Sequence, residues 1–217
     1  MSETTPTRTR SEEGRPPERA PRRRVNRREQ ILRTAADAFA SQGFNNTSLA
    51  DIAAMLDITP AGVLHHFGSK TDLLTAVLEL RDTNDPAPEG SGMLDHLVAT
   101  ARRNADRPGT TQLYAVLSAE SATAEHPAQE WFRKRYTVLR QEVEAAVLDR
   151  IGSEHREAAD TPGPHGHSPA RSAATAVLAA MDGLQVQWLL DPEAVDMAAV
   201  TELVIDAVVA GLSRSEP

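Results

Sequence analysis

The side chains best suited to chemistry gather in one short stretch, ITPAGVLHHFGSK, from Ile58 to Lys70. It holds the adjacent histidines His65 and His66 and one of only two lysines in a chain that otherwise carries positive charge on arginine. Histidine gains a proton near neutral pH and lysine is a cation, so both side chains can pair with phosphate oxygens. The stretch is therefore a candidate anion-binding surface, provided that helices position these residues together.

Two helices are predicted before this stretch. The first covers about residues 26–41, and Gly43 follows it as a C-cap residue. Its apolar stripe repeats every four residues, at Ile31, Ala35 and Phe39. Beyond it, Ser48 with Asp51 three residues later forms a capping-box variant, which opens a second, short helix.

A third short helix is predicted to begin at Pro60. Thr59 provides a side-chain N-cap, and Pro60 takes the first helical position, where its missing N–H has no cost. This helix runs to about Phe67, and a fourth opens near Lys70. Only the three residues from Asp57 to Thr59 separate the second helix from the third, so the pattern indicates a helix-turn-helix.

Composition limits the classes of protein that remain. The chain of 217 residues has no cysteine, which excludes disulfides and thiolate metal sites. Its longest apolar run, Ala173 to Met181, is too short to span a bilayer, and the polar N-terminus does not resemble a secretory signal. We therefore expect a cytoplasmic protein with no membrane partner.

Charge is distributed unevenly along the chain, although the net charge is -8. Residues 1–81 carry twelve Lys and Arg against ten Asp and Glu, while the remainder carries eleven against twenty-one. Nine arginines lie between Arg8 and Arg28. Residues 1–25 are therefore predicted to be a disordered basic arm that can meet phosphates, the alternative being a solvated tail.

The segment GFNNTSLADIAAMLDITPAGVLHHFGSKTDLLTAVL resembles the DNA-binding domain of the TetR family of bacterial repressors. The shared features are a Gly-aromatic pair, a Thr-Thr/Ser pair, Asp-Ile-Ala, a short turn, His-Phe-x-Ser-Lys and Leu-Leu. The resemblance extends from about Arg27 to Leu80. It implies a homodimer that binds double-stranded DNA at a palindromic operator and a second, helical domain that binds a small-molecule effector.

The resemblance and the helix ends together assign the DNA contacts. The candidates are Arg27, Thr47, Ser48, Pro60, Ala61, Gly62, Leu64, His65, His66 and Lys70. Thr47 and Ser48 lie at a helix N-terminus, which favours a phosphate, and Lys70 takes the family's phosphate-binding lysine position. Ordinary capping and a solvated surface charge are the alternatives. Leu64 stands where the family usually has a tyrosine, and a third helix without Arg, Asn or Gln predicts little direct reading of bases.

The whole chain is predicted to be all-α, with about nine helices. Residues 26–82 form the helix-turn-helix DNA-binding domain, and residues 83–217 form the ligand-binding and dimerisation domain. Later helices are expected at about 93–105, 110–125, 127–151, 169–190 and 193–212, with a flexible connection at 152–168. The final pair, about 169–212, is apolar on more than one side, and the resemblance implies that it forms the homodimer interface.

The effector is predicted to be a small, largely apolar molecule held between helices of the second domain. The candidate lining combines apolar bulk with a few polar atoms: Leu97, Leu117, Glu120, Trp131, Tyr136, Met181, Gln185 and Trp188. Glu120 and Gln185 lie on inward stripes, so each needs a polar partner. That partner is a ligand, a neighbouring arginine or a helix end.

No enzyme chemistry is predicted. The sequence has no Gly-rich phosphate loop, nucleophile elbow or recognisable carboxylate pair, so we expect no catalytic residue and no cofactor. His165 and His167 lie in a Gly-Pro loop without an obvious third ligand, which argues against a metal site. The sequence thus favours a ligand-responsive repressor. The alternative is a helical ligand carrier or small enzyme with a degenerate helix-turn-helix. Its best support is Leu64, which replaces the tyrosine usual in the family.

Overall fold

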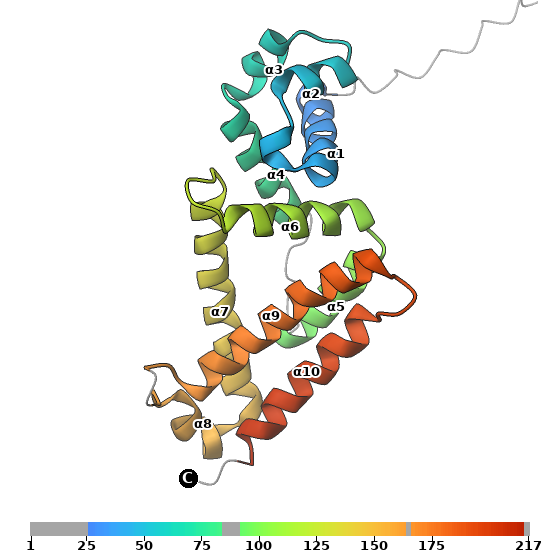
Figure 1. The fold of residues 1–217 in the computed structure, drawn as a ribbon. Helices are drawn as coiled ribbons and strands as arrows, with labels where there is room; N and C mark the ends of the chain where they lie inside the picture. The colour runs from blue at the N-terminus through green and yellow to red at the C-terminus, as the bar shows by residue number, and fades with distance from the viewer. Residues whose placement is uncertain (1–25, 84–91, 164–165, 215–217) are drawn as a thin grey trace, which may run out of the picture.

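The computed structural model describes residues 26–83, 92–163 and 166–214, and these ranges form ten α-helices (Figure 1). The N-terminal unit contains α1 (Arg27–Asn46), α2 (Leu49–Met55), α3 (Pro60–Phe67) and α4 (Lys70–Thr83). The second unit contains α5 (Met93–Ala105), α6 (Pro108–Ser121), α7 (Gln129–Ile151), α8 (Ser153–Asp160), α9 (Pro169–Leu190) and α10 (Met197–Leu212). The predicted all-α fold is confirmed, with one helix more than the nine expected.

Side-chain caps set where the helices of the N-terminal unit begin. The predicted capping box opens α2, since the backbone N–H of Asp51 donates to Ser48 Oγ and the N–H of Ser48 donates to the Asp51 carboxylate. Thr59 Oγ1 accepts the N–H of Gly62 at 3.2 Å and opens α3 as predicted. The first helix runs past its predicted end, because the chain kinks at Gly43 (φ 78°) and then makes another turn.

Two hydrophobic cores hold the molecule together, and the first is not confined to residues 26–82. It joins α1, α2, α3 and α4 to side chains of the second unit, namely Leu113, Tyr114, Leu117, Ala128 and Phe132. Figure 1 shows α6 lying across the lower end of the N-terminal unit, so that α6 belongs to both units. The two units are therefore packed together rather than merely tethered by the chain.

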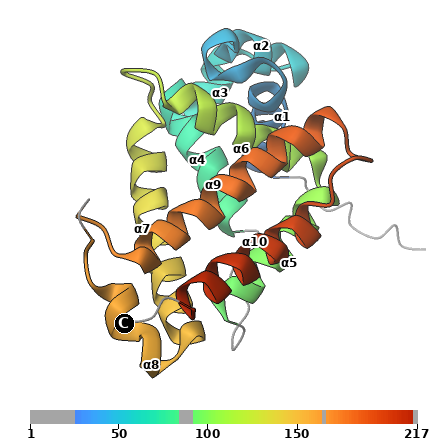
Figure 2. The same cartoon turned by 60° about the horizontal axis from the view of Figure 1, so that its bottom comes forward.

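The second core lies among α5, α7, α8, α9 and α10. Figure 2 shows α9 and α10 side by side, and α9 also packs against α7. Among the residues that the structure describes, α9 alone has the length and composition of a membrane span, and 44% of that stretch is buried in the bundle. The predicted apolar run 173–181 is thus the middle of a longer helix that contributes to the core.

Two predictions for the second unit were wrong. The expected flexible connection contains α8, whose eight residues bury only Ala159 and so show no apolar stripe in the sequence. The final helix begins at Met197 rather than near residue 193. Asp191 Oδ1 accepts the N–H groups of Glu193 and Ala194 in a turn, and Asp196 provides the true N-cap. The Asp191-Pro192 signature therefore marks a turn and not a helix start.

Several expectations fall outside the described residues. These are the basic arm of residues 1–25 and His165 of the His165/His167 pair. In the ranges that the structure does cover, no three His, Asp or Glu side chains are placed to hold a metal ion.

Candidate functional site

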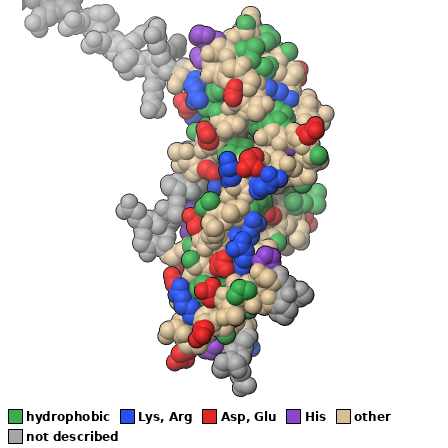
Figure 3. All heavy atoms as spheres, turned by 90° about the vertical axis from the view of Figure 1, so that its left-hand side faces the viewer, with side chains coloured by type: hydrophobic (Ala, Val, Ile, Leu, Met, Phe, Trp, Pro, Cys, Tyr) green, Lys and Arg blue, Asp and Glu red, His purple; other side chains and the backbone are tan. Residues whose placement is uncertain are grey.

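Helix α3 presents one face to solvent and anchors the other. Val63 and Phe67 are buried in the first core. The remaining candidates on this helix lie at the surface: Pro60, Ala61, Leu64, His65 and His66 are exposed, and Gly62 is half-buried. Figure 3 shows histidine side chains near the end of the molecule formed by the N-terminal unit. The structure thus brings these six sequence-predicted residues together on one helix available to a partner.

The start of α2 places Thr47 and Ser48 differently. Ser48 is exposed, and its hydroxyl lies 2.6 Å from the Asp51 carboxylate, whose pKa is lowered by the hydrogen bonds from Ser48. Thr47 is only 1% exposed, and its hydroxyl donates to the carbonyl oxygen of Gly43 at 2.8 Å. In this structure Ser48 is therefore at the surface, while the Thr47 hydroxyl fixes the corner between α1 and α2 instead of facing solvent.

The two predicted cationic contacts, Arg27 and Lys70, lie at helix starts. Lys70 is the first residue of α4, and its Nζ lies 4.0 Å from the centre of the Phe44 ring. Burial lowers the pKa of Lys70, and the nearby carboxylates of Glu120 and Asp51 oppose that shift. Arg27 is exposed at the start of α1. Next to it, the Arg28 guanidinium stacks over Phe67 of α3 at 4.7 Å, which ties α1 to the exposed helix.

The exposed surface of the N-terminal unit suits a duplex contacted mainly through its backbone. Helix starts at Ser48 and Lys70 offer N–H groups, a hydroxyl and an ammonium group, which favour phosphates. Between them, α3 offers small and apolar side chains with two imidazoles and no bidentate base-reading side chain. This chemistry supports a DNA affinity that comes mainly from phosphate contacts, with little reading of the bases.

A cavity of about 260 Å³ lies among α5, α6, α7 and α9 of the second unit, and Arg81 of α4 closes one side of it. Its lining includes four of the eight predicted effector residues: Leu97, Tyr136, Met181 and Gln185. It also includes charged and phenolic side chains that the sequence analysis did not select: Arg81, Tyr114, Arg135, Glu142 and Asp182. The cavity is therefore more polar than the apolar site predicted from the helical stripes.

The other four predicted effector residues lie elsewhere. Leu117 is fully buried in the first core, and Trp131 packs edge-on against Phe132 with ring centres 4.9 Å apart. Trp188 lines a separate cavity of about 490 Å³ beside the start of α10. Glu120 accepts the backbone N–H of Phe44 at 2.7 Å, so a helix end is its partner. Inward stripes alone thus did not distinguish these positions from the cavity wall.

A hydrogen-bonded pair forms one wall of the 260 Å³ cavity. The Tyr136 hydroxyl donates to Asp182 Oδ2 at 2.6 Å. Burial raises the pKa of Asp182, while the hydrogen bond from Tyr136 lowers it; burial also raises the pKa of Tyr136 and of Tyr114. Both phenols therefore stay protonated. An acidic residue directly after Met181 in an apolar helix is the sequence signal that could have identified Asp182.

Two arginines complete the polar wall. Arg81 lies over the Tyr114 ring at 4.2 Å, and both Arg81 and Arg135 bind the carboxylate of Asp82. The Nε–H of Arg135 is buried and has no hydrogen-bond partner within the described ranges. A buried donor of this kind destabilises the fold unless an acceptor forms a hydrogen bond with it. A ligand in the cavity is one such acceptor.

The helix-turn-helix and its exposed third helix define the class of protein, a helix-turn-helix DNA-binding protein. Comparison with known proteins gives the family. Residues 31–77 match the family described as bacterial regulatory proteins, tetR family. The HTH-type transcriptional regulator TtgR of Pseudomonas putida is 30% identical over 189 residues, which covers 82% of this chain and 88% of TtgR. The chain belongs to the TetR family of bacterial regulatory proteins.

Solved structures share the same fold. NalD, the secondary repressor of the MexAB-OprM multidrug efflux pump in Pseudomonas aeruginosa, has a TM-score of 0.62 at 21% identity, covering 87% of this chain and 98% of NalD. The SmeT–triclosan complex has a TM-score of 0.62 at 19% identity, covering 85% of this chain and 90% of SmeT. Membership of the TetR family makes the protein a helix-turn-helix transcriptional regulator, as TtgR is by name.

Proposed function

We propose that the protein is a cytoplasmic, ligand-responsive repressor that binds a palindromic operator as a homodimer and leaves it when a small molecule fills the 260 Å³ cavity. The related TtgR is a transcriptional regulator, NalD represses an efflux pump, and SmeT binds triclosan. The observation that carries the proposal is a polar cavity inside the helical unit that packs directly onto the DNA-binding unit.

The chemistry of the wall indicates what the effector carries. Leu97, Leu139 and Met181 offer apolar contacts, while Asp182 and the unpartnered Nε–H of Arg135 offer an acceptor and a donor. We infer that the effector has an apolar body and at least one group able to hydrogen-bond to this wall. This revises the largely apolar molecule that the sequence suggested.

The proposed dimer forms through α9 and α10. Three large apolar side chains on these helices are exposed in the single chain: Val186 (49%), Leu190 (82%) and Leu203 (66%). Covering them with a second copy removes apolar surface from water and creates a two-fold axis. Such symmetry requires a palindromic site whose half-sites lie one or more helical turns apart.

Release from DNA follows from the same symmetry. Both α3 helices must enter one duplex together, so a change of a few ångströms in their separation removes half of the contacts. A ligand that prefers the non-binding separation by about 1–3 kcal/mol weakens DNA binding by roughly 5 to 150-fold. The ligand therefore needs no direct contact with α3.

Fluorescence anisotropy with duplexes from the protein's own upstream region tests the proposal. We expect one fragment to bind much more tightly than random DNA, with affinity that falls steeply as salt rises. Sedimentation should show two chains per duplex, and triclosan is the first effector to test. Equal binding to every upstream fragment and to random DNA would refute the proposed binding to a specific operator.

A further inference from the structure

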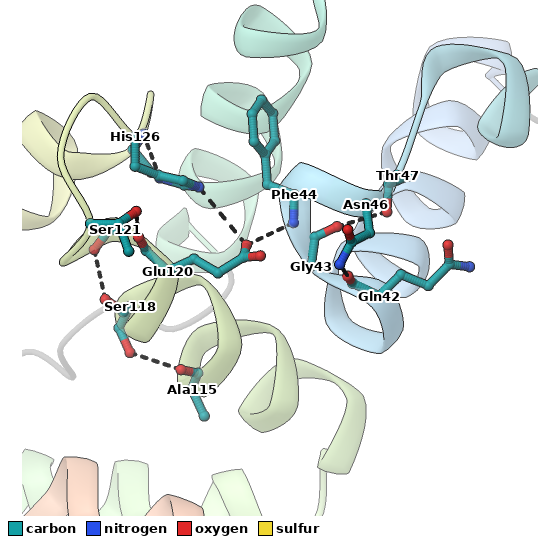
Figure 4. Close-up of polar contacts among 12 residues, drawn as sticks. Gln42, Gly43, Phe44, Asn46, Thr47, Ala115, Ser118, Glu120, Ser121 and His126 are labelled. Carbon is teal, nitrogen blue, oxygen red and sulfur yellow. Dashed lines mark hydrogen bonds and ion pairs between the residues drawn. The ribbon is translucent and has the colours of Figure 1, made fainter.

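Glu120 connects the second unit to the DNA-binding unit. It lies one residue before the end of α6, and its Oε2 accepts the backbone N–H of Phe44 at 2.7 Å (Figure 4). Phe44 follows the kink at Gly43 and stands three residues before Thr47, just ahead of α2. A carboxylate from the second unit therefore holds the corner from which α2 begins.

The corner is shaped to admit this carboxylate. A Cβ added at Gly43 would overlap Glu120 Oε1, at a separation that real contacts do not show. Gly43 also has φ 78°, a conformation that residues with a side chain rarely adopt. Glycine at this position thus serves both the kink and the close approach of Glu120.

Two further groups surround the same carboxylate. Lys70 lies over the Phe44 ring, and the Glu120 charge acts to raise the pKa of that lysine. His126, in the connection after α6, has its Nε2 3.8 Å from Glu120 Oε2 and its ring edge-on to Phe44 at 5.3 Å. Glu120 therefore acts on the α1–α2 corner and on the proposed phosphate-binding lysine at once.

The same helix also reaches the effector cavity. Tyr114 of α6 lines the 260 Å³ cavity and lies six residues before Glu120. At about 1.5 Å per residue, these positions are about 9 Å apart along the helix axis. Both lie within the fourteen residues of α6, so a displacement of α6 at the cavity moves the Glu120 end as well.

We propose that Glu120 is the positioning residue through which α6 sets the α1–α2 corner and Lys70, and so makes DNA affinity depend on the state of the second unit. The inference rests on the proposed function. It attributes the coupling between ligand binding in the cavity and DNA binding to one hydrogen bond. Ser48 and Lys70 contact phosphate only when this bond holds the corner in place.

Two variants separate the position of the corner from its charge. Glu120→Gln keeps an oxygen that accepts the Phe44 N–H, whereas Glu120→Ala removes it, and both lose the negative charge. We expect Glu120→Ala to bind the preferred upstream duplex about tenfold more weakly than Glu120→Gln, in line with the loss of a hydrogen bond to a buried backbone group. Glu130→Ala, at an exposed carboxylate of α7, is the matched control and should bind like the unaltered protein.

Hydrogen exchange of the Phe44 amide in the full-length chain gives a readout independent of DNA. We expect protection to be kept in Glu120→Gln and to fall by about tenfold or more in Glu120→Ala. Equal protection, or equal DNA affinity, in the two variants would overturn the proposal. Suppose that protection of the Phe44 amide differs between the two variants, but neither they nor the unaltered protein prefer any duplex. The proposed repressor function then fails, while the hydrogen bond between Glu120 and Phe44 is supported.

A double-mutant cycle with Gly43→Ala tests whether Gly43 and Glu120 act together on DNA binding. The unfavourable φ is present in every background, but the collision with Glu120 exists only when Glu120 is present. We therefore expect Gly43→Ala to weaken DNA binding more in the unaltered protein than in Glu120→Ala. Strictly multiplicative losses would show that the two residues act independently and would count against the proposal.

Discussion

The two units use their polar side chains in opposite ways. In the N-terminal unit, Ser48, Thr59 and Ser69 cap helices at the surface, and α3 remains exposed between them. In the second unit, Tyr136 and Asp182 turn inward and bind each other beside a cavity. One unit is therefore built to present a fixed surface, while the other keeps polar groups in an interior where a ligand can reach them.

The largest expected effect concerns the first core, which the two units share. Leu117→Ala should destabilise the protein by about 2–5 kcal/mol, since Leu117 is fully buried between them. Urea unfolding should show one cooperative loss of both units. Val138→Ala, at a side chain that is 50% exposed, serves as the control. Selective unfolding of the second unit alone would mean that the units are more independent than their packing indicates.

The next effect concerns the inward polar pair. Tyr136→Phe should cost about 1–3 kcal/mol, because the half-buried Asp182 carboxylate loses its donor. The pKa of Asp182 is already raised by burial, so its folded form takes up a proton at a higher pH than its unfolded form. The loss should therefore be larger at pH 8 than at pH 5, as measured by urea unfolding at each pH. A loss that is unchanged with pH would mean that Asp182 keeps the same protonation state at pH 5 and at pH 8.

A change at the half-buried Lys70 should affect DNA binding more than folding. Lys70→Ala should weaken specific and random DNA binding alike by about tenfold and reduce the salt slope by about 1. Lys134→Ala, at the chain's only other lysine, is the matched control on an exposed face of α7. Undiminished binding by Lys70→Ala at low salt would remove Lys70 from the phosphate contacts.

The smallest effect is a pH dependence at the junction. Burial lowers the pKa of His126, Lys70 adds to this shift, and Glu120 opposes it. The folded protein therefore resists a proton that the unfolded chain accepts near pH 6.5, so stability is full above that pH and declines below it. His126→Asn, which retains an acceptor for the N–H of Ala128, should flatten this decline in thermal unfolding, whereas His155→Asn should not.

Much of the N-terminal unit could be predicted because its signals are local. The cap signatures are recognisable within four residues of sequence: Ser48 with Asp51, and Thr59 with Pro60. Helices α2 and α3 begin where these caps place them. The exposed face of α3 follows from the same helix boundaries. The role of each exposed residue on DNA remains a prediction.

The second unit could be predicted less well, because its features depend on contacts between distant segments. Leu117 and Met181 both lie on apolar stripes, yet one is in the shared core and the other lines the cavity. The sequence left three kinds of hydrogen-bond partner open for Glu120. Its actual partner, the N–H of Phe44, lies 76 residues earlier in the chain and is brought to it only by the fold. Helix α8 was missed because its surface is polar on nearly every side.

Helix α6 also limits how this protein can be recombined with its relatives. A hybrid that joined residues 1–83 to a foreign sensor would leave the faces of α1 and α4 without Leu113, Leu117 and Phe132. Transplanting the DNA-reading part therefore requires carrying α6 and the start of α7 along with it, although they are separated from α4 in the chain. The exchangeable module is discontinuous in sequence, and a graft must follow the packing rather than the order of residues.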